Sequence, residues 1–161
     1  MTIALVPGAI EGRIFEDEHR RIRAGVAALQ ETINDADRLG QLDAVERVTR
    51  IVIWLRRDLL PHAAWEEAWL YPQLDRDTGS AWTTRALRIE HRQIRELAGR
   101  LDVALEELHA HWNHRVLIAL VAAMARLDAV LSAHLVQEDW FVLPLLDEPG
   151  TERDPKGGTP A

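Results

Sequence analysis

The chain has 161 residues, of which 47% are hydrophobic and 28% charged, and its formal net charge is −7. This composition is typical of one folded globular domain, and the negative charge disfavours nucleic acid as a partner. The absence of cysteine excludes disulfides and thiolate metal sites and favours the cytoplasm. We expect no membrane span, because the apolar runs fall short of the roughly 20 residues that a span needs.

Four segments carry apolar residues spaced alternately three and four apart, the pattern of a helix with one buried face. The first runs through Phe15, His19, Ile22, Val26, Leu29 and Ile33, and the second through Val45, Val48, Val52, Leu55, Leu59, His62, Glu66 and Trp69. The third runs through Leu87, His91, Ile94, Ala98, Leu101, Leu105 and Leu108, and the fourth through Leu117, Leu120, Met124, Leu127, Leu131, His134, Glu138 and Phe141. We predict four bundle helices with short connections near residues 39–42, 75–81 and 109–113.

Prolines mark irregular points in the second and fourth segments. Pro72 and Pro144 follow these segments and are predicted to stop the two helices. Pro61 lies inside the second segment and is predicted to kink that helix beside His62. The predicted organisation is an N-terminal extension (1–11), a helical bundle (12–147) and a disordered tail rich in Pro and Gly (148–161).

The two halves of the chain repeat at an offset of 72 residues. The segment 18–23 matches the segment 90–95, and four further pairs follow the same offset: His62 and His134, Glu66 and Glu138, Trp69 and Phe141, Pro72 and Pro144. Two duplicated helical hairpins would form an all-α, antiparallel, up-down-up-down four-helix bundle with approximate two-fold symmetry.

Six polar residues interrupt the apolar faces: His19, His62, Glu66, His91, His134 and Glu138. In an antiparallel bundle, the starts of the first and third helices lie beside the ends of the second and fourth, so all six converge at one end of the core. Charged groups are seldom buried unless they are paired or bind a metal.

This donor set suits two iron ions. Histidine and glutamate four residues apart share one helix face, and four imidazoles with two carboxylates match the ligand preference of iron. Each metal would take two histidines and share both carboxylates, with room for an oxo or hydroxo bridge and an exchangeable position. The alternative is a metal-free buried network of His–Glu hydrogen bonds.

These motifs resemble the hemerythrin-like family, the HHE cation-binding domains. The family pattern of one histidine followed by His-x-x-x-Glu, then repeated, is matched by His19, His62 to Glu66, His91, and His134 to Glu138. The runs 66–72 and 138–144 also resemble the family's acidic-apolar-proline run. The resemblance covers about residues 12 to 147 and implies a non-haem di-iron centre bridged by Glu66 and Glu138.

The chain departs from the pattern of oxygen carriers in that family. Carriers have a second histidine on the third helix, where this chain has Arg95. Carriers end with His-x-x-x-x-Asp, a spacing that Asp139 fits from His134, but Glu138 lies on the apolar face and is the repeat mate of Glu66. Asp139 and Glu67 then become partners of the ligands or surface acids.

We therefore expect a di-iron protein that binds or reacts with oxygen, peroxide or nitric oxide, rather than a reversible oxygen transporter. The alternatives are a substrate-oxidising or peroxidase- or catalase-like oxidoreductase, a non-catalytic iron or oxygen sensor, and a structural zinc or mixed-metal site. Candidate proton-transfer groups, which could equally be solvated surface charges, are Glu18, Glu67 and Glu90. The expected partner is a small diatomic or peroxide ligand, and the expected state is a monomer or weak oligomer.

Three further groups of residues have ordinary explanations beside a functional one. The loop histidines are expected to cap helices or face solvent, or else to form an accessory metal site: His109, His111 and His114. Tryptophans near the site are expected to fill the core or form an aromatic wall: Trp65, Trp69 and Trp140. A collar of arginines is expected to form surface ion pairs or a channel for small anions: Arg20, Arg21, Arg23, Arg92 and Arg95.

Overall fold

The computed structural model describes residues 7–147, with side chains from Phe15 to Leu146, and this part of the chain is helical without strands. The prediction of an all-helical fold is confirmed. The helices are α1 (Pro7–Asp35), α2 (Gln41–Trp54), η1 (Leu55–Leu59), α3 (Leu60–Trp65), η2 (Glu66–Leu70), α4 (Tyr71–Asp77), α5 (Arg85–Ala110), α6 (His114–Phe141) and α7 (Leu143–Asp147). Helix α1 therefore starts inside the predicted extension, and the predicted tail lies outside the described residues.

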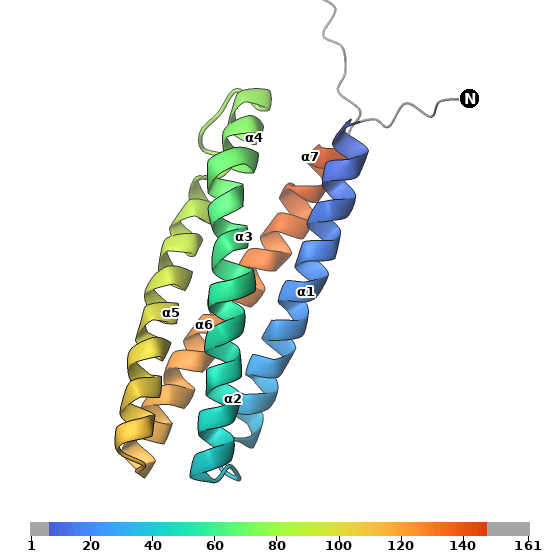
Figure 1. The fold of residues 1–161 in the computed structure, drawn as a ribbon. Helices are drawn as coiled ribbons and strands as arrows, with labels where there is room; N and C mark the ends of the chain where they lie inside the picture. The colour runs from blue at the N-terminus through green and yellow to red at the C-terminus, as the bar shows by residue number, and fades with distance from the viewer. Residues whose placement is uncertain (1–6, 148–161) are drawn as a thin grey trace, which may run out of the picture.

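The helices form four rods, because α2, η1, α3, η2 and α4 follow one another as one continuous rod (Figure 1). In Figure 1 the chain runs down α1, up through α2 to α4, down α5 and up α6, and α7 lies beside the start of α1. Contacts join α5 with α6, α1 with α6, α2 with α5 and α1 with α2. Each rod thus packs against two others around a shared core.

The predicted apolar faces form that core. Ile22, Leu55, Leu101 and Leu127 come from the four rods, and each has at most 2% of its surface exposed. Burying a leucine or isoleucine side chain contributes about 2 kcal/mol, so the three-four spacing is the main cause of the bundle. A second, smaller cluster closes the end at which α1 begins: Phe15, Leu70, Tyr71, Leu74, Leu87, Val142 and Leu146.

The helix around Pro72 does not stop there, contrary to prediction. It continues as α4 to Asp77, and the structure absorbs each internal proline in a wider π-helical turn, η1 before Pro61 and η2 before Pro72. A proline has no N–H to donate and its ring crowds the carbonyl four residues earlier, which a widened turn relieves. Helix α6 does end before Pro144, which lies in the first turn of α7.

The turn η2 corrects the prediction of which side chains face the core. An extra residue in this turn buries Leu70 and Tyr71, whereas Trp69 is 69% exposed. At the end of α6, Val142 is buried and Phe141 is 66% exposed. Trp65 and Trp140 are also exposed, so the expectation that these tryptophans fill the core is wrong.

Helix α6 with α7 is the most apolar part of the chain. The stretch His114–Leu146 is long and apolar enough to cross a membrane by length and composition alone, contrary to the expectation from its apolar runs. The same stretch packs against α5 and α1 and carries the buried His134 and Glu138 into the core. Core helices of soluble bundles satisfy the same criterion, so the absence of a membrane partner stays a prediction.

Candidate metal centre

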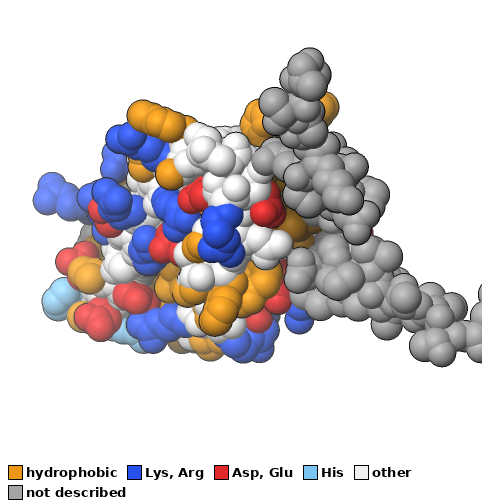
Figure 2. Space-filling model, turned by 90° about the horizontal axis from the view of Figure 1, so that it is seen from above, with side chains coloured by type: hydrophobic (Ala, Val, Ile, Leu, Met, Phe, Trp, Pro, Cys, Tyr) orange, Lys and Arg blue, Asp and Glu red, His pale blue; other side chains and the backbone are white. Residues whose placement is uncertain are grey.

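The six predicted polar residues come together inside the half of the bundle where α1 begins and α6 ends. They come from all four rods and are buried: His19, His62, Glu66, His91, His134 and Glu138. His62 is the most exposed of them, at 7%. Seen from above, the end of the bundle shows arginine and acidic side chains mixed with hydrophobic ones (Figure 2). The cluster therefore lies beneath a mixed surface, between the main core and the smaller apolar cluster.

The six residues form two groups of four. One group is His19, His62, Glu66 and Glu138, and the other is Glu66, His91, His134 and Glu138. Within each group, one nitrogen or oxygen atom per residue lies within 4.8 Å of the others. Both carboxylates belong to both groups, which is the arrangement of two neighbouring cation sites joined by shared ligands.

The separations between these atoms match those between ligands of one ion. His62 Nε2 lies 3.0 Å from Glu66 Oε1, and His91 Nε2 lies 2.9 Å from His134 Nε2. His134 Nε2 lies 3.3 Å from Glu138 Oε2. Two donors about 2.1 Å from a metal and at right angles to each other are about 3 Å apart. A metal ion therefore fits between the donors without rearrangement of the helices.

Five of the buried polar atoms that face the centre of the cluster lack hydrogen bonds. These buried atoms are His19 Nε2, His62 Nε2, both oxygens of Glu66, and Glu138 Oε2. Leaving a buried polar atom unpaired costs about 1–3 kcal/mol, and more for a charged one. A bound cation would compensate these costs, whereas a closed network of hydrogen bonds would not leave five atoms without partners. The donor set thus fits a metal better than it fits the metal-free alternative.

The other ring nitrogen of each histidine contacts a carboxylate. The pairs are His19 Nδ1 with Asp139 at 3.3 Å, His62 Nδ1 with Glu18 at 2.8 Å, His91 Nδ1 with Glu67 at 3.1 Å, and His134 Nδ1 with Glu90 at 3.0 Å. A carboxylate that accepts from Nδ1–H fixes the ring and leaves Nε2 to face a metal. These four acids therefore orient the imidazoles. Their contacts favour a role as partners of the histidines over the alternative that they are solvated surface charges.

Three arginines of the collar lie near these acids: Arg21 lies 4.0 Å from Glu18, and the other two are closer to their partners. Arg23 bridges to Asp139, and Arg95 Nη1 donates to Glu67 Oε1 at 2.9 Å. Arg95 stands at the position where oxygen carriers have a further histidine. In this chain it binds Glu67, the carboxylate that contacts His91 Nδ1. The ion-pair explanation of the collar is the one that the geometry supports at Arg23 and Arg95.

The cluster shifts the proton affinities of its members. Burial alone would lower the pKa of His19, but the carboxylates of Glu138 and Glu66 outweigh it and raise the pKa to about 9. Burial would likewise lower the pKa values of His62 and His134, but nearby carboxylates outweigh burial and raise both values. Burial would raise the pKa of Glu66, but three histidines hold it well below its usual range. Without metal, protons take the place of cations among these carboxylates.

Sequence reasoning missed Tyr71. Its side chain is fully buried, and its hydroxyl group donates a hydrogen bond to Glu138 Oε1. The hydroxyl oxygen of Tyr71 also lies 3.4 Å from His91 Nε2. Burial and the carboxylates of Glu66 and Glu138 raise the pKa of this phenol. The only available signal was that its repeat mate, Leu143, is apolar. This difference between repeat mates does not indicate a role for Tyr71 unless it is known that the turn η2 points its side chain into the core.

The loop histidines lie at the other end of the bundle. His109 lies in the last turn of α5 with Nδ1 2.8 Å from the Leu105 carbonyl oxygen, and both His111 and His114 are exposed. Asn113, between them, caps α6 by accepting from the Val116 N–H. Among the described residues the candidate metal groups do not include these histidines, and capping and exposure are the roles that the structure shows.

Comparison with known proteins agrees with the geometry. The family model described as "Hemerythrin HHE cation binding domain" matches residues 12–146. Searches of curated proteins and of solved structures found no match. The match spans most of the chain and contains all six clustered residues. The chain therefore belongs to the hemerythrin HHE cation-binding domain family.

Proposed function

We propose that the six residues hold two iron ions and that the protein uses them to bind or react with oxygen, peroxide or nitric oxide. The observation that carries this proposal is the pair of buried four-residue groups that share Glu66 and Glu138. Nitrogen and carboxylate donors suit iron, and a shared pair of carboxylates suits two ions close together. Bound iron would supply electron exchange with a small ligand.

The burial of the cluster supports a small ligand over a large substrate. A cavity of about 260 Å³ opens beside the cluster, and His62 is the clustered residue that lines it. The remaining lining residues are Glu18, Arg21, Ile22, Arg57, Asp58, Pro61 and Trp65. Since His62 is only 7% exposed, a ligand of a few atoms suits this approach better than an organic substrate.

Glu18 is the residue best placed to move protons in this proposal. Its carboxylate lines the cavity, and its Oε2 lies 2.8 Å from His62 Nδ1. It can pass a proton between water in the cavity and the imidazole without entering the cluster. Glu90 has the same relation to His134 but its side chain is less exposed, 19% against 34%.

We also propose that the bundle arose from two repeated hairpins in an antiparallel arrangement. The contacts behind the histidines support this, because they follow the 72-residue offset. The pair Glu18–His62 corresponds to Glu90–His134, and Glu67–His91 corresponds to Asp139–His19. Arg23 and Arg95 correspond in the same way.

Anaerobic iron loading tests the site. We expect two irons per chain, measured by elemental analysis after desalting, and loss of most iron in His62→Ala and in Glu66→Ala. His111→Ala, in the loop at the far end, is the matched control and should bind as much iron as the unaltered chain. Full iron content in both site variants would refute the ligand assignment.

Stopped-flow spectroscopy tests the reactivity. The iron-loaded, reduced protein is mixed with oxygen, with hydrogen peroxide and with nitric oxide in separate experiments. We expect the absorption spectrum to change with at least one of them, and to change more slowly in Glu18→Gln with an oxidant that needs protons. A spectrum that stays constant with all three would favour a structural metal site.

A further inference from the structure

The two shared carboxylates of the cluster have different surroundings. Glu66 and Glu138 are repeat mates and both are fully buried. Glu66 has two oxygens without hydrogen bonds, whereas Glu138 has only Oε2 without one, since Tyr71 donates to Oε1. The repeat predicts equal roles for these carboxylates, and the structure breaks that equality at one hydroxyl group.

Glu66 offers a different oxygen to each group. Its Oε1 lies 3.0 Å from His62 Nε2, and its Oε2 lies 3.2 Å from His91 Nε2. His62 belongs to one group and His91 to the other. The geometry of Glu66 is thus that of a carboxylate bridging two ions through both oxygens.

Glu138 offers the same oxygen to both groups. Its Oε2 lies 3.3 Å from His19 Nε2 and 3.3 Å from His134 Nε2, and these histidines belong to different groups. The other oxygen accepts the hydrogen bond of Tyr71. Glu138 therefore meets both cation positions through one atom.

Tyr71 is held rigidly in this place. Its ring stacks on His91, with 5.4 Å between ring centroids and 20° between planes. The guanidinium of Arg88 lies 5.2 Å from the centre of the phenol ring and is itself fixed by Asp75 at 3.2 Å. At the repeat-mate position, Leu143 has no hydroxyl to give Glu66 an equivalent partner.

We propose that Tyr71 sets the binding mode of Glu138, holding it to a single-oxygen bridge while Glu66 bridges through both oxygens. Tyr71 is a positioning residue in this role, because it acts on the metals through Glu138. A single-oxygen bridge draws two ions closer together than a two-oxygen bridge does. This inference rests on the proposed binding of two metal ions.

Tyr71→Phe tests the inference, because it removes the hydroxyl and keeps the ring against His91. The metal–metal distance is measured by X-ray absorption on the anaerobic diferrous protein, in which no oxo bridge competes. We expect the variant to keep two irons per chain and to show a longer metal–metal distance, as Oε1 becomes free to bind. An unchanged distance in the fully loaded variant would overturn the proposal, as would loss of iron from it.

Two further measurements separate the possible outcomes. Trp69→Phe is the matched control, since Trp69 is an aromatic residue two positions before Tyr71 whose side chain is 69% exposed, and it should leave the metal–metal distance unchanged. A visible tyrosinate-to-iron band in the ferric protein that disappears in Tyr71→Phe would overturn the proposal, since the phenol would then bind iron itself. Failure of the unaltered chain to bind iron would instead refute the proposed function.

Discussion

Each imidazole of the cluster has its own carboxylate partner, but the four carboxylates differ in strength as acceptors. Arg23 neutralises Asp139 and Arg95 neutralises Glu67, whereas Glu90 accepts from the neutral amide of Gln137 at 2.6 Å. A free carboxylate makes an imidazole a stronger donor than a carboxylate already paired with an arginine. In the second group, one histidine, His91, therefore has a neutralised partner, and the other, His134, has a partner that is not paired with an arginine.

The second group offers a matched pair of variants for this effect. Glu90→Gln should weaken metal binding by about 10–100-fold, because His134 loses its charged partner. Glu67→Gln should weaken metal binding less, because Arg95 already offsets the charge of Glu67. Competition of Zn²⁺ between the protein and a chelating dye measures both. Equal losses in the two variants would contradict a role for the arginine.

The raised pKa of His19 predicts how the stability of the metal-free protein depends on pH. The carboxylates around His19 raise its pKa to about 9 in the folded state, whereas a histidine without such neighbours, as in the unfolded chain, has a pKa of 6.5. Its contribution to stability is present in full below pH 6.5 and is lost as the pH rises through about 9. The unfolding temperature of the metal-free protein should therefore fall over this range, and His19→Asn should reduce the slope.

Metal binding should show the opposite trend with pH. Metals compete with the protons that the cluster holds, so the increase in unfolding temperature on adding Zn²⁺ should grow from pH 6.5 to pH 9. Differential scanning calorimetry with and without metal measures both trends on the same samples. A metal-induced increase that is independent of pH would show that the cluster holds no displaceable protons.

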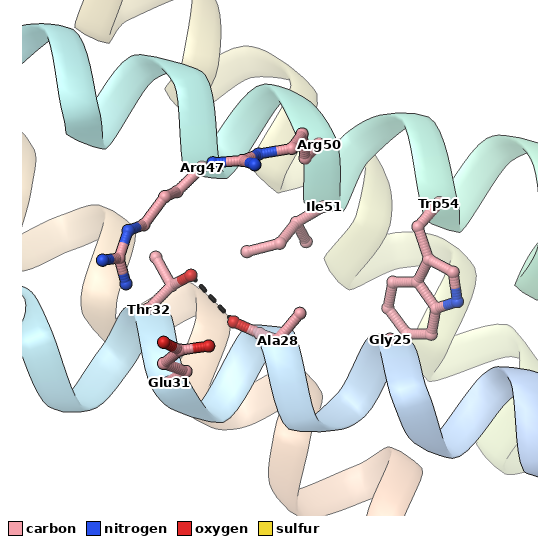
Figure 3. Close-up of a pocket in the computed structure, with 8 residues that line it drawn as sticks. All are labelled: Gly25, Ala28, Glu31, Thr32, Arg47, Arg50, Ile51 and Trp54. Atoms are coloured by element: carbon pink, nitrogen blue, oxygen red, sulfur yellow. Dashed lines mark hydrogen bonds between the residues drawn. The ribbon is translucent and has the colours of Figure 1, made fainter.

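At the scale of the elements, the packing of α1 on α2 depends on a close approach. The indole of Trp54 lies directly against Gly25, beside a pocket that also exposes Arg47 and Arg50 (Figure 3). A Cβ atom at Gly25 would lie 1.9 Å from Trp54 Cε2, which is far inside van der Waals contact. Glycine at this position is thus required by the partner helix rather than by the backbone of α1.

Gly25→Ala should destabilise the protein by about 1–3 kcal/mol, because the indole must move within a packed interface. Gly99→Ala is the matched control, since Gly99 lies in α5 with no atom within 4 Å of an added Cβ. It should stabilise the protein by about 0.5–1 kcal/mol through helix propensity. Urea unfolding measures both, and similar effects of the two variants would contradict the close approach.

At the scale of the whole molecule, the cluster joins all four rods. His19 lies on α1, His62 on α3, His91 on α5 and His134 on α6. A metal bound to these residues is bound only by the folded chain, so binding contributes directly to global stability. The main core on one side and the smaller apolar cluster on the other keep water from this junction.

Adding Zn²⁺ or anaerobic Fe²⁺ to the metal-free protein should therefore raise the stability of the entire bundle. At a free concentration of 100 times Kd, one filled site contributes about 2.7 kcal/mol. The effect should disappear in His134→Ala and remain in a variant that replaces His109, His111 and His114 by alanine. Thermal unfolding measured at 222 nm checks this, and loss of the effect in the loop variant would place the metal at the other end.

The sequence determined the helices, most of the core-facing positions and the six residues of the cluster. It did so because helical periodicity and the 72-residue repeat are local properties of the chain, and a buried charge interrupting an apolar face is visible in the residues themselves. Errors arose where periodicity itself changed. At Trp69 the three-four spacing predicts a buried side chain, but the wider turn of η2 rotates Trp69 outward.

Only the tertiary structure decided which partners meet across the helices. The pairs Asp139–His19 and Glu67–His91, and the hydrogen bond from Tyr71 to Glu138, join residues on different rods. Such contacts depend on the rotation of each helix about its axis, and a shift of one residue turns a side chain by about 100°. The residues in the cluster are therefore readable from the sequence, whereas the oxygen that each carboxylate offers is set by the packing of four rods together.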